Sequence, residues 1–146
     1  MTMGGCIYDP PKKGNEIIIH NQTEGYIFVT DSLPAQGNIR LYDTSLVNKR
    51  RQVETKGEYI PRHANGEYFL YEAQYHQLKR KENGTVTLYF IVEKDIGKTY
   101  DEIKRDKLYK EFSAGPDDVM NSELNHIFYY NDTIILEHTY GVEKYR

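Results

Sequence analysis

The chain of 146 residues contains no tryptophan and only one cysteine, Cys6. One cysteine cannot form an internal disulfide and cannot supply a structural zinc site with a second thiolate. The longest apolar runs, Ile17–Ile19 and Leu88–Val92, are far shorter than the roughly 20 residues of a membrane-spanning helix. The 22 acidic and 19 basic residues give a net charge of -3, so no overall positive field favours nucleic acid.

The chain is rich in aromatic side chains that carry a hydroxyl. It has 14 tyrosines and five phenylalanines, and 38% of its residues are apolar. This composition and length predict one folded domain rather than a disordered chain. Tyrosine rings favour strands, and each buried hydroxyl needs a polar partner or a route to solvent.

The segment from Cys6 to Asn15 reads CIYDPPKKGN and has no hydrophobic periodicity. Its two prolines favour an extended linker. Residues 1–15 are therefore interpreted as a tether, and residues 16–146 as a single β-rich domain.

Short apolar and aromatic segments separated by turn residues predict a series of strands. Glu16–His20 and Gly25–Thr30 are typical of a hairpin with a short polar loop. The alternating segment Thr85–Glu93 has bulky side chains on both faces, which predicts a central strand. No structure is assigned to the polar, basic residues 44–56. The remaining predicted strands are Asn38–Asp43, Glu58–Ile60, Glu67–Glu72, Asn125–Tyr130 and Thr133–Thr139.

One amphipathic helix is predicted in the second half of the chain. Thr99 and Glu102 have the spacing of a capping box, in which each side chain binds the other residue's backbone amide. Ile103, Leu108 and Phe112 extend this helix toward Gly115–Pro116, and a short helical turn is predicted at Asp117–Met120. The predicted fold is mainly β, an antiparallel β-sandwich-like single domain with one amphipathic helix before the last hairpin.

The sequence indicates no catalytic residue, metal site or cofactor. The five histidines are His20, His63, His76, His126 and His138, and none has the i, i+4 spacing of a zincin. There is no Gly-x-Ser-x-Gly nucleophile motif. A hydrolase would need a cleft that joins His63 or His76 to a carboxylate, and we consider this the weakest hypothesis.

Four tyrosines, Tyr59, Tyr68, Tyr71 and Tyr75, lie in one stretch with amides and carboxylates. Such a combination suits the face of a sugar or a peptide, although rings on alternate strand positions also pack into a core. An alternative function is nucleic-acid binding by a soluble intracellular β-barrel through Lys49–Arg51 and Lys79–Lys81. Nearby acidic residues favour solvated loops for both clusters instead.

The order of several motifs resembles that of a known family. Cys6 follows two small residues and precedes the Pro-Lys-Gly tether, and Ile17–Thr23 is an apolar-Asn-polar-Thr segment. Leu88–Val92, Thr99–Ile103 and Leu108–Tyr109 follow in the same order as in small uncharacterised lipoproteins of gut Bacteroidetes. Two positions where that family has tryptophan carry Tyr100 and His126.

This resemblance implies a location and not a chemistry. It implies acylation of Cys6 and a membrane anchor in the bacterial cell envelope, and the family offers no catalytic residues to transfer. We therefore expect a non-catalytic binding or structural module that takes a glycan, a peptide or a partner protein.

Overall fold

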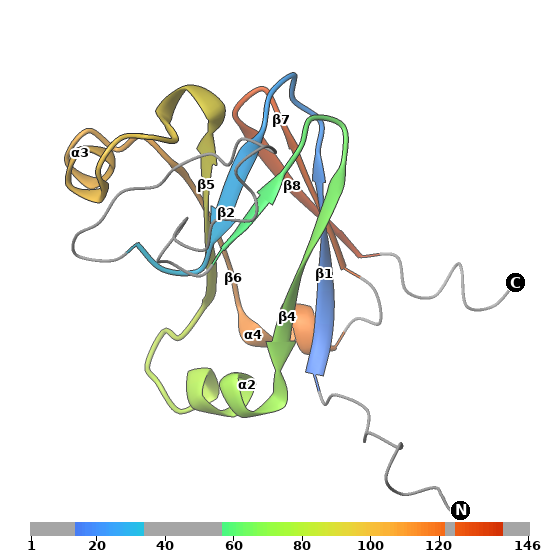
Figure 1. Cartoon of the computed structure of the whole chain (residues 1–146). Coiled ribbons are helices and arrows are strands. Elements are labelled where there is room, and N and C mark those ends of the chain that lie inside the picture. Colours follow the sequence, from blue (N-terminus) through green and yellow to red (C-terminus); the bar gives the residue numbers. More distant parts are fainter. Residues whose placement is uncertain (1–13, 34–56, 122–124, 139–146) are drawn as a thin grey trace, which may run out of the picture.

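The strands pair into two four-stranded sheets that face each other (Figure 1). The structure is a computed structural model, and it describes residues 14–33, 57–121 and 125–138. The first sheet has the order β4-β1-β7-β8 and the second the order β3-β2-β5-β6. Every neighbouring pair is antiparallel except β1 and β7, which are parallel. The strands are β1 (Gly14–Asn21), β2 (Ile27–Thr30), β3 (Glu58–Ile60), β4 (Asn65–Tyr71), β5 (Val86–Val92), β6 (Lys110–Ala114), β7 (Asn125–Tyr130) and β8 (Thr133–His138).

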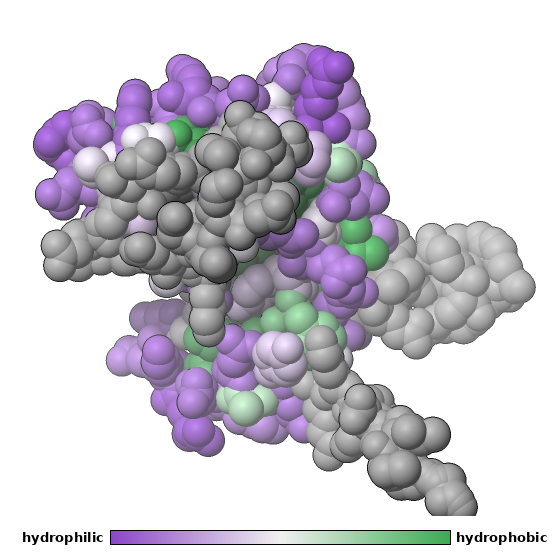
Figure 2. Space-filling model, viewed as in Figure 1, coloured by the Kyte–Doolittle hydropathy of each residue, from purple (hydrophilic) through white to green (hydrophobic). Residues whose placement is uncertain are grey.

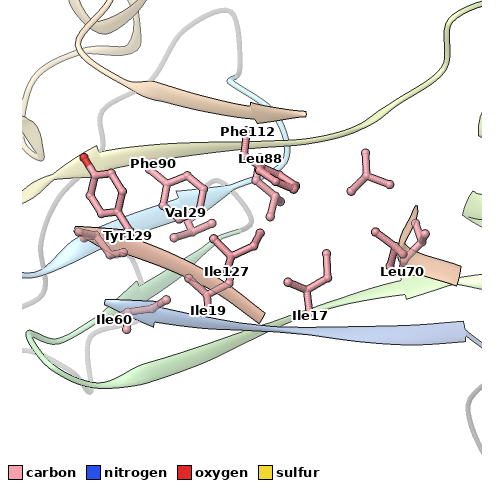
Figure 3. Packing of buried hydrophobic residues seen from close by; sticks show 13 residues of the cluster. Ile17, Ile19, Val29, Ile60, Leu70, Leu88, Phe90, Phe112, Ile127 and Tyr129 are labelled. Atoms are coloured by element: carbon pink, nitrogen blue, oxygen red, sulfur yellow. The ribbon is translucent and has the colours of Figure 1, made fainter. Parts of the chain in front are cut away.

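Apolar side chains from the inner faces of both sheets form the main core (Figure 3). Ile17, Ile19 and Ile127 of the first sheet are fully buried against Leu88 and Phe90 of the second. Full burial of one such side chain contributes about 1.5–3 kcal/mol. The β-sandwich-like single domain predicted from the sequence is confirmed.

The prediction of a central strand at Thr85–Glu93 is also confirmed. β5 lies between β2 and β6, and side chains on both of its faces are buried. Leu88 and Phe90 point into the main core, whereas Ile91 joins Phe28 and Ile103 in a second cluster. Helix α3 (Tyr100–Arg105) covers this second cluster, so β5 is enclosed on both sides.

Helix α3 begins as predicted and ends earlier than predicted. Thr99 Oγ1 accepts from the Glu102 amide at 3.1 Å, and Glu102 Oε1 accepts from the Thr99 amide at 3.0 Å. The predicted continuation to Phe112 is wrong, because Lys107 adopts a φ of 51° and turns the chain away. The following residues form β6 beside β5, where Phe112 is buried in the main core.

Two further helices connect the sheets. α4 (Pro116–Met120) confirms the short helical turn read at Asp117–Met120. α2 (Glu72–Lys79) was not predicted, and the expectation of one helix is therefore wrong. Its sequence, EAQYHQLK, is mostly polar and has no apolar stripe that would indicate a helix. In agreement with this, none of its residues is fully buried. A short 3-10 helix, η2 (Glu93–Asp95), follows β5.

The predicted hairpin of Glu16–His20 with Gly25–Thr30 is wrong. β1 and β2 belong to different sheets, and the chain crosses the sandwich between them. β1 also begins at Gly14, so the last two residues of the predicted tether belong to the first sheet. The predicted strand Asn38–Asp43, residues 44–56 and Cys6 lie outside the described residues.

The final hairpin is confirmed, with β7 and β8 in antiparallel register. Asn131 and Asp132 at its turn have φ angles of 47° and 64°. Positive φ at both central residues is the backbone of a type I′ turn, which matches the twist of the two strands.

The buried side chain of Asn21 joins two of the places where the chain crosses between the sheets. Its Nδ2 group donates to the carbonyl oxygen of Gly25, between β1 and β2, at 2.8 Å. It also donates to the carbonyl oxygens of Ile60 and Pro61, between β3 and β4, at 2.9 Å each. Its Oδ1 accepts from the Thr23 amide at 3.0 Å. Both crossings are thereby tied to the end of β1.

Asp117 of α4 joins the two crossings at the other end of the sandwich. α2 leads from β4 to β5, and α4 leads from β6 to β7. The Asp117 carboxylate accepts from the Tyr75 hydroxyl at 2.6 Å and from Lys79 Nζ at 2.7 Å. These two bonds lower the pKa of Asp117. The sheets are therefore fastened at both ends by side-chain hydrogen bonds.

We predict that Asn21→Ala lowers the free energy of unfolding by about 2–4 kcal/mol, because it removes the several hydrogen bonds by which this buried side chain joins the two crossings. Urea denaturation measures this change. The control is Gln22→Ala at the adjacent exposed position, for which a change below about 0.5 kcal/mol is expected. Equal stability of the two variants would contradict the role assigned to Asn21.

Candidate functional site

A cleft of about 280 Å³ lies between β4 and the second sheet. Ile19, Val29 and Leu88 line its apolar part. A second hollow of about 190 Å³ adjoins it on the side of α2, and Asp31 and Tyr68 line both. Figure 2 shows apolar side chains between more polar regions of the same face.

The boundary between the two hollows is a contact between the sheets. The Tyr68 hydroxyl of β4 donates to Asp31 Oδ2, just after β2, at 3.2 Å. Burial and the Asp31 carboxylate raise the pKa of Tyr68 to about 12. The phenol is therefore a neutral donor at neutral pH, and the carboxylate beside it is an acceptor.

Polar side chains surround this contact on both sides. Thr30 and Glu58 line the larger hollow, and Gln77, Thr85 and Thr87 line the smaller one. Carboxylate, amide and hydroxyl groups offer both donors and acceptors around an apolar floor. Such a site suits a ligand that carries several hydroxyl groups on an apolar frame.

The exposed edge of β4 is protected from pairing with another strand. Glu58 Oε1 accepts from the Glu67 amide at 3.1 Å, and Gln74 Oε1 accepts from the Tyr71 amide at 3.0 Å. Edge amides occupied by side chains are less available to a foreign strand. The cleft beside this edge is thus better suited to a small ligand than to a β-strand.

The structure separates the four tyrosines expected to share a binding face. Tyr68 and Tyr71 both line the cleft, and Tyr71 is 43% exposed. Tyr59 packs against Phe28 in the second cluster, with ring centroids 4.9 Å apart. Tyr75 lies on α2 and packs against the main core. A ligand role for these residues stays a prediction, with Tyr68 and Tyr71 in the position that suits it best.

Asp31 was missed by the sequence analysis. It lies 37 residues before its partner Tyr68, and no local pattern links the two positions. The available signal was a carboxylate directly after the apolar strand Ile27–Thr30.

Of the basic clusters and histidines of the other hypotheses, those within the described residues do not line the larger hollow. Lys49–Arg51 lies outside the described residues. In the second cluster, Lys79 is paired with Asp117, while Lys81 lines the smaller hollow. His63 bonds to Glu24 at 3.0 Å in an exposed pair, and His76 is exposed on α2.

Within residues 14–33, 57–121 and 125–138, no group of three or more His, Cys, Asp or Glu side chains is arranged to hold a metal ion. In the same part of the chain, no helix has the length and apolar character needed to cross a membrane. Comparison of the chain with models of protein families, with curated proteins and with solved structures finds no match.

The raised pKa of Tyr68 predicts a loss of stability in alkali. Below about pH 10 the phenol is neutral in both the folded and the unfolded chain. Between pH 10 and a pKa of about 12 the unfolded chain loses this proton first, so the free energy of unfolding falls as pH rises. We predict that Tyr68→Phe makes the fall in the free energy of unfolding less steep. Denaturation at a series of pH values measures this slope.

Tyr130→Phe is the control, since Tyr130 is 56% exposed and lies away from the cleft. It should leave the slope unchanged. An identical slope in the wild type and in Tyr68→Phe would contradict the environment assigned to Tyr68.

Proposed function

We propose that this protein is a non-catalytic binding module that takes a glycan in the cleft crossed by Tyr68 and Asp31. The observation that carries the proposal is this contact between a neutral phenol and a carboxylate at the boundary of two hollows. A sugar hydroxyl can donate to Asp31 and accept from the Tyr68 hydroxyl. The apolar face of the sugar ring can pack on the apolar floor beside it.

The aromatic pair at the cleft edge supports a sugar as the ligand. The rings of Phe69 and Tyr71 lie edge to face with centroids 4.7 Å apart, and both residues line the cleft. Aromatic rings offer a rigid apolar surface at a low cost in conformational entropy. The carboxylates of Asp31 and Glu58 near this surface disfavour phosphate groups, and therefore a nucleic acid, in the cleft.

We further propose that the protein is located in the bacterial cell envelope and that acylated Cys6 anchors the domain. The support is the resemblance of the motifs around Cys6 and Thr99–Ile103 to envelope lipoproteins. Seven residues lie between Cys6 and the first described residue, Gly14, and the eight residue steps from Cys6 to Gly14 span at most about 28 Å. The domain would thus stay near the bilayer surface, where envelope glycans are found.

A glycan array, followed by titration calorimetry on the sugars it retains, tests the ligand. Tyr68→Phe removes one hydroxyl and is expected to weaken binding about threefold to tenfold. Asp31→Asn removes the charged acceptor and is expected to weaken it at least tenfold. Tyr130→Phe should bind like the wild type. Retention of no sugar, or Tyr68→Phe and Asp31→Asn variants that bind as tightly as the wild type, would overturn the proposal.

Metabolic labelling with a clickable fatty acid in a Bacteroidetes host tests the anchor. The wild-type protein, expressed from its complete gene, should carry the label and sediment with membranes. Cys6→Ser should lose both properties. An unlabelled wild type would refute the anchor and leave the glycan proposal standing.

A further inference from the structure

The outer face of the first sheet presents two rows of side chains that each cross all four strands. The strand registers align Glu67, Ile18, His126 and Glu137 in one row. The same registers align Asn65, His20, Phe128 and Ile135 in the next row. We call these eight residues the outer face. In Figure 1, the helices lie at one end of this sheet and beside the other sheet, and none covers the outer face.

Large apolar side chains are exposed on this sheet and not on the other. Within the described residues, those with the largest exposure are Tyr71 at 43%, Tyr130 at 56% and Ile135 at 50%. Tyr130 and Ile135 belong to β7 and β8 and point away from the core by strand alternation, whereas Tyr71 lies at the end of β4, at the edge of the cleft. Such a group of exposed apolar side chains is typical of an interaction surface.

Three aromatic rings form a stacked row at the centre of the outer face. The ring centroids of His20 and Phe128 are 4.3 Å apart, and those of His20 and His126 are 5.1 Å apart. His20 Nε2 lies 2.8 Å from His126 Nδ1, a distance at which one ring donates to the other. Burial and the neighbouring His126 lower the pKa of His20. This shift disfavours the charged form of the His20 ring.

The charged side chains of the outer face other than its two histidines are acidic. Glu67 and Glu137 lie at opposite ends of one row and are exposed, and Glu16 lies on the same side of β1. The strands of this sheet, as far as the structure describes them, contain no lysine or arginine. An apolar, aromatic centre between carboxylates is complementary to a segment that carries both cationic and apolar side chains.

We propose that the outer face is a docking surface for a basic, apolar segment of a partner protein, laid across the stacked rings with its cationic side chains toward Glu67 and Glu137. A second copy of this chain does not fit, because two acidic faces would repel each other. An anionic lipid surface is disfavoured for the same reason. This surface is separate from the Tyr68–Asp31 contact, so either proposal can fail without the other.

Binding of a synthetic peptide with alternating lysine and leucine, measured by fluorescence anisotropy, tests the proposal. Glu137→Lys reverses one charge at the end of the row and is expected to raise the dissociation constant about tenfold. Ile135→Ser removes an exposed apolar contact and is expected to raise it severalfold. The control is Glu111→Lys on β6 of the other sheet, which changes the net charge equally and should have little effect.

A matched peptide with glutamate in place of lysine should not bind. Equal losses of affinity in Glu137→Lys and Glu111→Lys would show that the peptide is attracted by the net charge of the protein, and would overturn the proposal. Binding of both peptides would overturn it as well, as would a wild-type protein that binds neither. Concentration-dependent self-association that Ile135→Ser abolishes would instead assign the face to a second copy.

Discussion

The side-chain amide of Asn21 is the interaction on which the arrangement of the two sheets depends. It lies at the end of β1 and bonds the carbonyl groups of both neighbouring crossings at once, at Gly25 and at Ile60 and Pro61. A buried amide is stable only when such partners are present, so its geometry allows one relative placement of these segments. Apolar packing between the sheets has no such directional requirement. The hydrogen bonds of Asn21 supply that requirement.

The cleft follows from fastening the sandwich at its two ends. Asn21 holds one pair of crossings and Asp117 the other, and the cleft lies between the edge strand β4 and the second sheet. The Tyr68–Asp31 hydrogen bond spans this gap. It places a polar pair over an apolar floor, which is an arrangement that a binding module can use without any catalytic group. The outer face offers a second surface of different character, acidic and aromatic.

The sequence predicted those elements whose signal is local. Alternation identified β5, the capping box identified the start of α3, and the turn residues Asn131 and Asp132 identified the last hairpin. Contacts between segments that lie far apart in the chain could not be predicted from the sequence. Glu16–Thr30 has the pattern of a hairpin, and only the buried bonds of Asn21 turn it into a crossing. Asp31 could not be assigned to the site, because its partner Tyr68 is brought near by the fold. α2 was missed because its sequence, EAQYHQLK, is mostly polar and shows no apolar stripe.

Native-state hydrogen exchange at the Asn21 crossing tests the central claim most directly. The Asn21 amide donates to Ala64 O at 2.9 Å, and the Thr23 amide donates to Asn21 Oδ1 at 3.0 Å. If Asn21 holds both crossings in one cooperative unit, these two amides exchange only through global unfolding, with the same free energy as the core of β5. Exchange through local opening, at the rate of exposed turn amides such as that of Asp132, would contradict the account.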